Sequence, residues 1–187
     1  MSRLKITNLP IDGLKLIERK FLADSRGHFS RLFCAEELSA AGWIKPIAQI
    51  NHTLTLKKGS VRGMHYQQSP YSEMKLVSCI RGELLDVAVD LRNNSDTYLQ
   101  YHEEFLSSEN GKALLIPEGF AHGFQSLTDN VELIYCHSMF YHQEAESGIN
   151  PKDERLNIEW PLPITDISDR DNIHPPINQY FKGLDNK

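Results

Sequence analysis

The sequence has 187 residues, of which 40% are hydrophobic and 24% are charged, and its formal net charge is −5. These values predict a single globular domain, residues 1–187, that can bury a full core. The negative charge argues against a protein that binds nucleic acid polymers, because such proteins carry a surplus of basic residues. It leaves room for a single nucleotide ligand, which needs only two or three arginines.

The cysteines are Cys34, Cys79 and Cys136, an odd number with no CxxC pair. This pattern predicts free thiols in a reducing compartment. Residues 1–20 mix charged and apolar side chains and do not resemble a signal peptide, and no run of about 18 apolar residues occurs. We therefore expect a cytoplasmic protein without a membrane segment.

The first clear element is a short helix over residues 35–41. This segment reads AEELSAA, is rich in helix-forming residues and is followed by Gly42, which suits the C-terminal end of a helix.

Strands are predicted next, at residues 75–80 and 83–91, with Arg81-Gly82 between them. In the second run, ELLDVAVDL, side chains alternate between two sets with a period of two residues. This alternation predicts a strand with one buried face.

Further strands are predicted at 103–106, 113–116 and 131–141, the first two separated by the tight-turn pair Asn110-Gly111. On the last strand, Tyr135, His137 and Tyr141 have even separations and should share one face. Many strands at short intervals indicate a barrel or a sandwich. The tail after Trp160 is proline-rich and predicted to be irregular, with at most a short helix.

Three segments carry candidate chemistry: 61–67 together with Lys75, 116–124, and 168–171. Each residue alone has an ordinary interpretation. His65 could be a hydrogen-bonded structural residue and Lys75 could protect a strand edge. Tyr135 could fill the core, and Asp171 and His122 could belong to turns.

The segments are more informative together. Pro117-x-Gly119-x-x-His122 resembles the second motif of the cupins, and Gly63-x-His65-x-Gln67 stands where the first motif supplies two metal-binding histidines. Gln67 replaces the second histidine, and one imidazole with an amide makes a poor site for a divalent ion. We expect an all-β fold, a cupin-type jelly-roll β-barrel with a few short helices, and no metal.

A more specific resemblance covers residues 14–176. The chain resembles the RmlC family, the dTDP-4-dehydrorhamnose 3,5-epimerases. The resemblance lies in DSRGHF (24–29), QIN (49–51), VRGMHYQ (61–67), KLV (75–77), DVAVDLR (86–92), IPEGFAHGF (116–124), Trp160-Pro161 and SDRD (168–171).

The resemblance implies roles for individual residues. His65 would be the catalytic base, Asp171 its partner, Lys75 the residue that stabilises the enolate, and Tyr135 the acid on the opposite face of the sugar. The resemblance implies diphosphate and sugar contacts for Arg26, Arg62, Gln49 and Asn51, and aromatic walls around the nucleotide base for Phe29 and Tyr141. His122 would line the same cavity. Further candidates for substrate binding are Arg31, Glu73 and Arg170.

These residue types suit the implied reaction. A ketone at C4 acidifies the hydrogens at C3 and C5, and histidine side chains titrate near neutral pH, as a general base should. An ammonium group can stabilise the enolate, and two arginines can bind a diphosphate. No step requires a metal or an organic cofactor.

Two positions depart from the family pattern. The family commonly reads RGxFxE where this chain has Arg31, and it often has glutamine where this chain has Glu73. Thymine presents an N–H donor at N3 and cytosine presents an acceptor, so Arg31 would suit a CDP sugar. The alternative is that Arg31 points to solvent. Glu73 could pair with Arg31 or another arginine.

The resemblance also implies a homodimer in which N-terminal strands are exchanged, so that Arg26 and Phe29 reach the neighbouring cavity. It places the enzyme in deoxysugar biosynthesis for surface polysaccharides such as O-antigen. Three alternatives stay open at this point: a CDP-sugar epimerase acting at one carbon, a metal-dependent cupin, and a non-catalytic nucleotide-sugar binding module. The metal-dependent cupin would need His52 or His137 beside His65 and His122.

Overall fold

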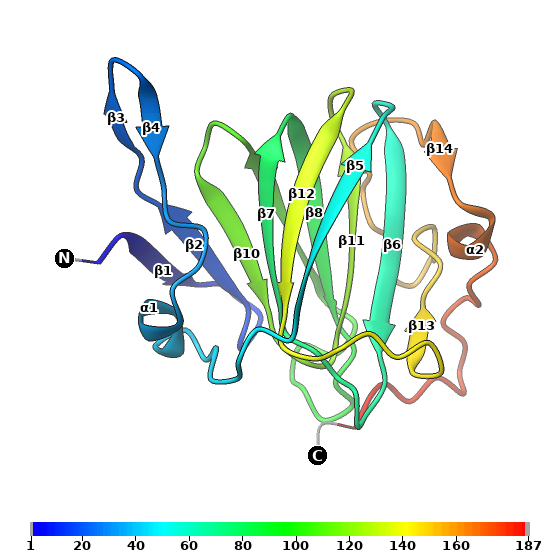
Figure 1. Cartoon of the computed structure of the whole chain (residues 1–187). Helices are drawn as coiled ribbons and strands as arrows, with labels where there is room; N and C mark the ends of the chain where they lie inside the picture. Colours follow the sequence, from blue (N-terminus) through cyan, green and yellow to red (C-terminus); the bar gives the residue numbers. More distant parts are fainter. Residues whose placement is uncertain (1, 186–187) are drawn as a thin grey trace.

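The computed structural model describes residues 2–185 and shows two β-sheets packed face to face (Figure 1). The six-stranded sheet runs in the order β1 (Leu4–Asn8), β2 (Lys15–Arg19), β10 (Lys112–Ile116), β7 (Lys75–Arg81), β12 (Val131–His137) and β5 (Gln49–Thr55). The second sheet runs in the order β13 (Glu146–Gly148), β6 (Ser60–Gln67), β11 (Phe120–Ser126), β8 (Glu83–Asp90) and β9 (Tyr101–Ser107), and β14 (Asp166–Ile167) pairs with β6 in parallel.

The remaining elements are short. They are the hairpin of β3 (Leu22–Asp24) and β4 (Gly27–Phe29) and the helices α1 (Ala35–Ser39) and α2 (Asp169–Asn172). The predicted all-β fold of the cupin jelly-roll type is confirmed. No helix in residues 2–185 is both long enough and apolar enough to cross a membrane.

The core between the sheets positions the site. On β12, Val131 and Leu133 are fully buried in this core, and the next inward positions are Tyr135 and His137. On β7, Cys79 and Val77 lie in the core and the next position on that face is Lys75. Because alternate residues of a strand share a face, both strands change from apolar to polar toward one end of the barrel. A polar cavity therefore forms at that end.

The strand predicted over 83–91 is present, but the prediction of one buried face is wrong. Leu84 and Ala88 pack between the sheets, and Val87 and Val89 are also fully buried. The outer face is covered because the chain after β13 folds back over it, with Ile149, Leu156 and Ile177 in the same cluster. Because a segment distant in the chain covers this face, the alternation of residues within the strand could not predict that the face is buried.

The strand predicted over 131–141 ends at His137. Its neighbours β5 and β7 begin at Gln49 and Lys75, the residues paired with His137. Beyond that point Ser138 still donates its backbone N–H to the backbone oxygen of Met74, and Tyr141, three residues further, lies in a loop. The face shared by Tyr135 and His137 is confirmed, and Tyr141 reaches the same cavity from that loop.

The local turn predictions are largely confirmed. The helix over residues 35–41 ends at Ser39, and Gly42 follows with a φ of 97°, which suits glycine. Asn110-Gly111 does turn the chain, but β9 pairs with β8 while β10 pairs with β2 and β7. The turn therefore joins the two sheets. The tail after Trp160 contains β14 and α2.

Candidate active site

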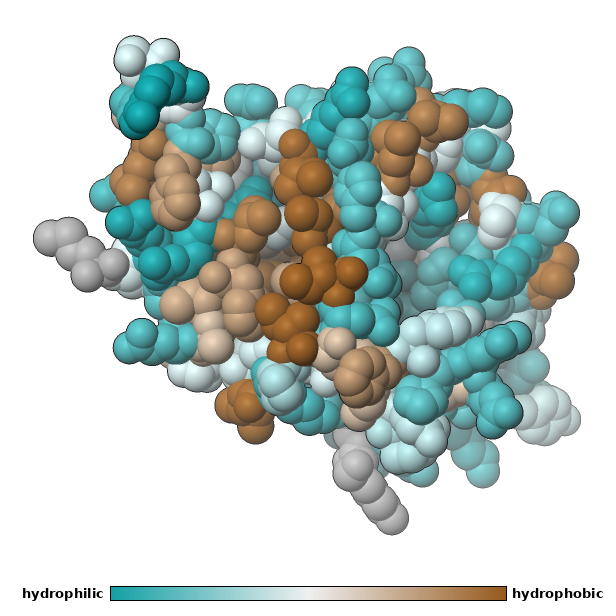
Figure 2. All heavy atoms as spheres, viewed as in Figure 1, coloured by the Kyte–Doolittle hydropathy of each residue, from teal (hydrophilic) through white to brown (hydrophobic). Residues whose placement is uncertain are grey.

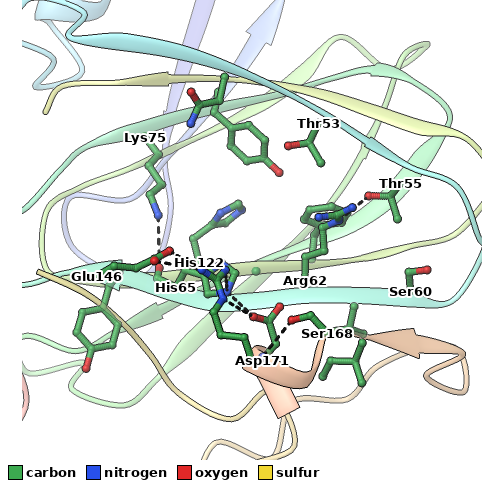
Figure 3. Close-up of a pocket in the computed structure, with 18 of the residues that line it drawn as sticks. Thr53, Thr55, Ser60, Arg62, His65, Lys75, His122, Glu146, Ser168 and Asp171 are labelled. Atoms are coloured by element: carbon green, nitrogen blue, oxygen red, sulfur yellow. Dashed lines mark hydrogen bonds and ion pairs between the residues drawn. The ribbon is translucent and has the colours of Figure 1, made fainter. Parts of the chain in front are cut away.

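A cavity of about 820 Å³ opens between the two sheets. The predicted site residues that line it are His65, Asp171, Tyr135, Lys75, Gln49, Asn51, Arg62, Glu73, His122, Tyr141 and Arg170. Arg26, Phe29 and Arg31 do not line it. Figure 3 shows Lys75 on one side of the cavity, with His65 and Asp171 on the other.

His65 projects from β6, and its Nε2 lies 2.8 Å from Oδ1 of Asp171. Asp171 is buried at the start of α2, where its backbone N–H donates to Oγ of Ser168, and its Oδ2 accepts from the backbone N–H of Gly63. Burial by itself would raise the pKa of Asp171, but the hydrogen bond and charge of His65 outweigh it and hold this pKa well below its usual range. The carboxylate is therefore charged when it orients the imidazole.

Glycine at position 63 allows β6 to approach β11. It has a φ of 125°, and a Cβ there would lie 2.5 Å from Cα of Gly123. A side chain would therefore force the two strands apart. Two positions further along β6, His65 lies directly across from His122 of β11, after a register shift between Phe124 and His122.

Arg170 lies over the His65–Asp171 pair. Its guanidinium approaches Nε2 of His65 at 3.1 Å and Oδ1 of Asp171 at 3.4 Å, and it bonds both carboxylate oxygens of Glu146. Glu146 also accepts from the hydroxyl of Tyr141 at 2.8 Å. Arg170 is thus held in place and adds positive charge at the cavity entrance.

Lys75 and Tyr135 come from the other sheet. Lys75 is buried, with its Nζ 3.2 Å from Oε1 of Glu73 and 3.4 Å from the backbone oxygen of His65. Burial, followed by the negative charge of Asp86, raises the pKa of Tyr135 well above its usual value. The phenol therefore keeps its proton at neutral pH and can act as a donor.

His122 belongs to a second buried histidine–aspartate pair. Its Nε2 lies 2.7 Å from Oδ1 of Asp86, and its ring meets that of Tyr135 edge-on with centroids 5.9 Å apart. Asp86 is fully buried, and its Oδ2 has no hydrogen-bond partner in the described structure.

Polar groups line the rest of the cavity. Arg62 donates to Oγ1 of Thr55 at 3.0 Å and to the backbone oxygen of Leu54 at 3.3 Å. The side chain of Gln49 accepts from the backbone N–H of Tyr141. Asn51 contacts His137 at 3.3 Å. These contacts fix one cation and two amides where an anionic, hydrogen-bonding ligand could lie.

The N-terminal candidates lie elsewhere. The β3–β4 hairpin stands clear of both sheets in Figure 1, and Arg26 and Phe29 are exposed on it. Arg26 forms an ion pair with Asp24. Arg31 forms an ion pair with Glu37 of α1, so neither sequence interpretation of Arg31, base contact or free solvent exposure, anticipated its partner. The suggested pairing of Glu73 with an arginine is wrong, because Glu73 pairs with His137 and Lys75.

The histidines named for a metal-dependent cupin are not brought together. Within residues 2–185, the cluster with ligand atoms close enough for one ion is His65, Asp171 and His174. His52 instead bonds Glu132, and His137 bonds Glu73. The guanidinium of Arg170 lies against two of the three cluster residues, and a second cation there would be repelled.

Sequence reasoning missed Asp86 and Glu146. Asp86 falls on the inward set of its strand between Leu84 and Ala88, and an acid at such a position is a signal that could have been used. Glu146 lies after the strand expected over residues 131–141, in a region rich in loops. No alternation of apolar and polar residues there marks it as inward-facing. His137 was considered as a metal ligand, whereas the structure places it beside Glu73.

Comparison with known proteins identifies the family. A sequence model described as dTDP-4-dehydrorhamnose 3,5-epimerase matches residues 8–179. A dTDP-4-dehydrorhamnose 3,5-epimerase from Shigella flexneri is 40% identical over 169 residues, which is 90% of this chain and 93% of the relative. The chain belongs to the dTDP-4-dehydrorhamnose 3,5-epimerase family.

Solved structures of family members share the whole fold. The crystal structure of the 3,5-epimerase RmlC from Legionella pneumophila, in complex with dTDP-4-keto-L-rhamnose, has a TM-score of 0.92 and 37% identity, covering 98% of this chain and 99% of that one. The 3'-monoepimerase ChmJ from Streptomyces bikiniensis, in complex with dTDP-quinovose, has a TM-score of 0.84 and 33% identity, covering 90% of this chain and 85% of that one.

Proposed function

We propose that this protein is an isomerase that epimerises a dTDP-linked 4-keto-6-deoxy sugar, with His65 as base and Tyr135 as acid. The observation that carries this proposal is the placement of the His65–Asp171 pair on one wall of the cavity, with Lys75 and Tyr135 on the other. Inversion at carbon needs proton removal on one face and proton delivery on the other. Groups on opposite walls meet that requirement.

The proton steps follow from the contacts. Nε2 of His65 is engaged by Asp171, so Nδ1 is the nitrogen left for the substrate. It takes the proton from the carbon beside the ketone, and the electron pair of the broken C–H bond moves to the C4 oxygen as an enolate. Lys75 stabilises this oxyanion, a contribution of about 3 kcal/mol for a preorganised donor. Tyr135 then donates its proton to the opposite face, and solvent restores both residues.

The nucleotide half of the substrate supplies binding energy and position. Arg62 lies on the cavity wall and is suited to the diphosphate. Arg26 and Phe29 have the chemistry for a phosphate and a base, but they lie on the projecting hairpin. This arrangement supports a homodimer in which each hairpin completes the cavity of its partner.

A band of apolar side chains supports the dimer. Figure 2 shows apolar atoms gathered in a band on the face of the six-stranded sheet that also faces the viewer in Figure 1. Large exposed apolar residues on this sheet include Ile50 and Leu54 of β5 and Ile80 of β7. An exposed band of this kind typically marks a protein interface.

The test of the activity is isotope exchange. The protein is incubated in D₂O with dTDP-4-keto-6-deoxyglucose, and deuterium at C3 and C5 is counted by proton NMR and mass spectrometry. Deuterium at both carbons supports a 3,5-epimerase, and deuterium at one carbon supports a monoepimerase. No exchange, beside an active relative as control, would contradict the proposal.

The CDP alternative is tested by running the exchange experiment with the CDP sugar in parallel and by measuring the binding of dTDP and of CDP to the protein. Because Arg31 is paired with Glu37, a free guanidinium at the nucleotide base is not favoured, and we expect tighter binding of dTDP than of CDP. Tighter binding of CDP would reverse this preference.

The dimer is tested by complementation. In the proposed dimer, each cavity takes His65 from one protomer and Arg26 from the hairpin of its partner. A dimer of one Arg26→Ala chain and one His65→Asn chain therefore has one cavity that carries both substitutions and one cavity that carries neither. We expect both single variants to lose activity and their re-folded mixture to recover about a quarter of it, because half of the dimers are mixed and each has one intact site. A mixture as inactive as its components would contradict the exchange of hairpins between protomers.

We also place the enzyme in the cytoplasm, since Cys34, Cys79 and Cys136 are all free thiols.

A further inference from the structure

A buried carboxylate lies behind Lys75. Glu73 precedes β7 and directs Oε1 to Nζ of Lys75 at 3.2 Å and Oε2 to Nδ1 of His137 at 2.8 Å. The side chains of all three residues are at most 9% exposed. His137 ends β12 directly across from Lys75 in the strand register. The three groups therefore form one unit in the wall of the cavity.

The unit uses most of the hydrogen-bonding capacity of Lys75. An ammonium group has three N–H donors. Glu73 accepts one, and the backbone oxygen of His65 lies in position for a second at 3.4 Å. The third N–H is left for the cavity. A lysine side chain has several free torsions, and two fixed acceptors restrict where its Nζ can lie.

His137 extends the unit to the substrate pocket. Its Nε2 lies 3.3 Å from Nδ2 of Asn51, which lines the cavity. An amide that donates to Nε2 requires the imidazole proton to be on Nδ1, where it is donated to Glu73. The hydrogen bonds then run from Asn51 through His137 and Glu73 to Lys75.

The carboxylate is charged in this setting. Burial alone would raise the pKa of Glu73, but the hydrogen bond from His137 and the charge of Lys75 outweigh it, so this pKa lies below its usual value. Lys75 contacts Glu73, which precedes its own strand, and the backbone oxygen of His65 on β6, and it lies across from His137 in the register of β12. Tyr135 lines the same cavity.

We propose that Glu73 and His137 are positioning residues that hold the ammonium of Lys75 with one N–H directed at the C4 oxygen of the sugar. This role rests on the epimerase activity proposed above. It makes Glu73 part of the enolate-stabilising device through Lys75, without contact to the sugar. Placement errors of about 1 Å can cost about 100-fold in rate.

The test compares three variants in the exchange assay. Glu73→Ala removes the carboxylate oxygens that accept from Lys75 and His137, and we expect kcat to fall about 10- to 100-fold with little change in KM. Glu73→Gln keeps an oxygen acceptor for Lys75, and we expect it to recover most of the lost kcat. His137→Ala should lower kcat less than Glu73→Ala, and the double variant should be no worse than Glu73→Ala, because the residues act as a unit.

A matched control lies on β9, away from the cavity and from the exposed face of the six-stranded sheet. Glu104 has Oε1 2.6 Å from Nζ of Lys112 and Oε2 3.6 Å from Nε2 of His102, so it repeats the carboxylate–histidine–cation pattern. None of these three residues lines the cavity, and we expect Glu104→Ala to keep kcat within about twofold. Equal losses in Glu73→Ala and Glu73→Gln, or a loss confined to KM, would overturn the positioning role.

A second readout separates the two proposals. Crystal structures of the wild type and Glu73→Ala report the position of Nζ of Lys75 independently of activity. We expect Nζ to shift or to spread over several positions in the variant. An Nζ unmoved within about 0.5 Å would overturn the positioning role even in an active enzyme. Absence of exchange by the wild type would instead overturn the epimerase proposal, whatever the position of Nζ in the two crystal structures.

Discussion

Nε2 of His65 lies 2.8 Å from Oδ1 of Asp171, although 106 positions separate the two residues in the chain. The other oxygen of Asp171 accepts from the backbone of Gly63, so one carboxylate orients the imidazole and fastens α2 to β6. In the proposed mechanism, catalysis and the attachment of the C-terminal tail therefore depend on the same side chain, and the two contributions can be measured separately.

The catalytic contribution is tested with Asp171→Asn. An amide keeps the shape of the side chain but can present its N–H₂ group to the imidazole, which favours the wrong tautomer. We expect the rate of deuterium exchange to fall by about 10³-fold or more, as when a catalytic histidine loses its carboxylate partner. The measurement is kcat in D₂O, with the fold checked by circular dichroism. A folded variant within tenfold of the wild type would contradict the role of Asp171.

The structural contribution of Asp171 should depend on pH. Because the folded-state pKa is held below the usual 3.8, this carboxylate stabilises the fold above about pH 4, and the stabilisation is lost as the pH falls further. We expect the free energy of unfolding of Asp171→Asn to be lower than that of the wild type by about 2 kcal/mol at pH 7. Urea titrations at pH 7 and pH 3 should show this difference shrinking at the lower pH. A constant difference would show that the charge is not responsible.

Tyr135 should separate proton exchange from inversion. In Tyr135→Phe the base can still remove a proton and return a deuteron from solvent to the same face, whereas delivery to the opposite face lacks its donor. We expect recovered substrate to contain deuterium while the epimerised product falls by about 100-fold. Proton NMR distinguishes the two outcomes in one sample. Equal loss of exchange and inversion would assign Tyr135 another role.

Glu37 should secure the N-terminal strand. Hydrogen bonds from Ser2 and the backbone of Leu4, followed by those from Arg31 and Arg3, lower the pKa of Glu37 from 4.5 to about 2. The stabilisation is complete above pH 4.5 and is lost as the pH falls toward 2.

We therefore expect Glu37→Gln to lower Tm at pH 7, and to lower it much less near pH 2.5. Differential scanning calorimetry at both pH values measures this change. Glu36→Gln, on the same helix turn, serves as the control and should leave Tm unchanged. An equal effect of the two substitutions would contradict the specific role of Glu37.

Local sequence patterns were enough to predict many of the strands. Period-two alternation and turn residues were enough to predict β7, β8, β9, β10 and most of β12, because these signals act between neighbouring residues. Alternation could not show that the tail covers the outer face of β8, or that β12 ends where its partners begin. Both depend on segments far away in the chain.

The site residues also fall into two groups, those named from the sequence and those identified only in the structure. The order of its motifs was sufficient to name His65, Lys75, His122, Tyr135 and Asp171, because family motifs preserve residue types along the chain. Only the tertiary structure placed Asp86 against His122, Glu146 against Arg170, and Glu73 between Lys75 and His137. These partners depend on which strands and loops meet across the barrel. The type of a charged residue does not specify its partner, which is determined only when the chain folds. The sequence thus determined the reactive groups, and the packing of the two sheets decided what holds each of them in place.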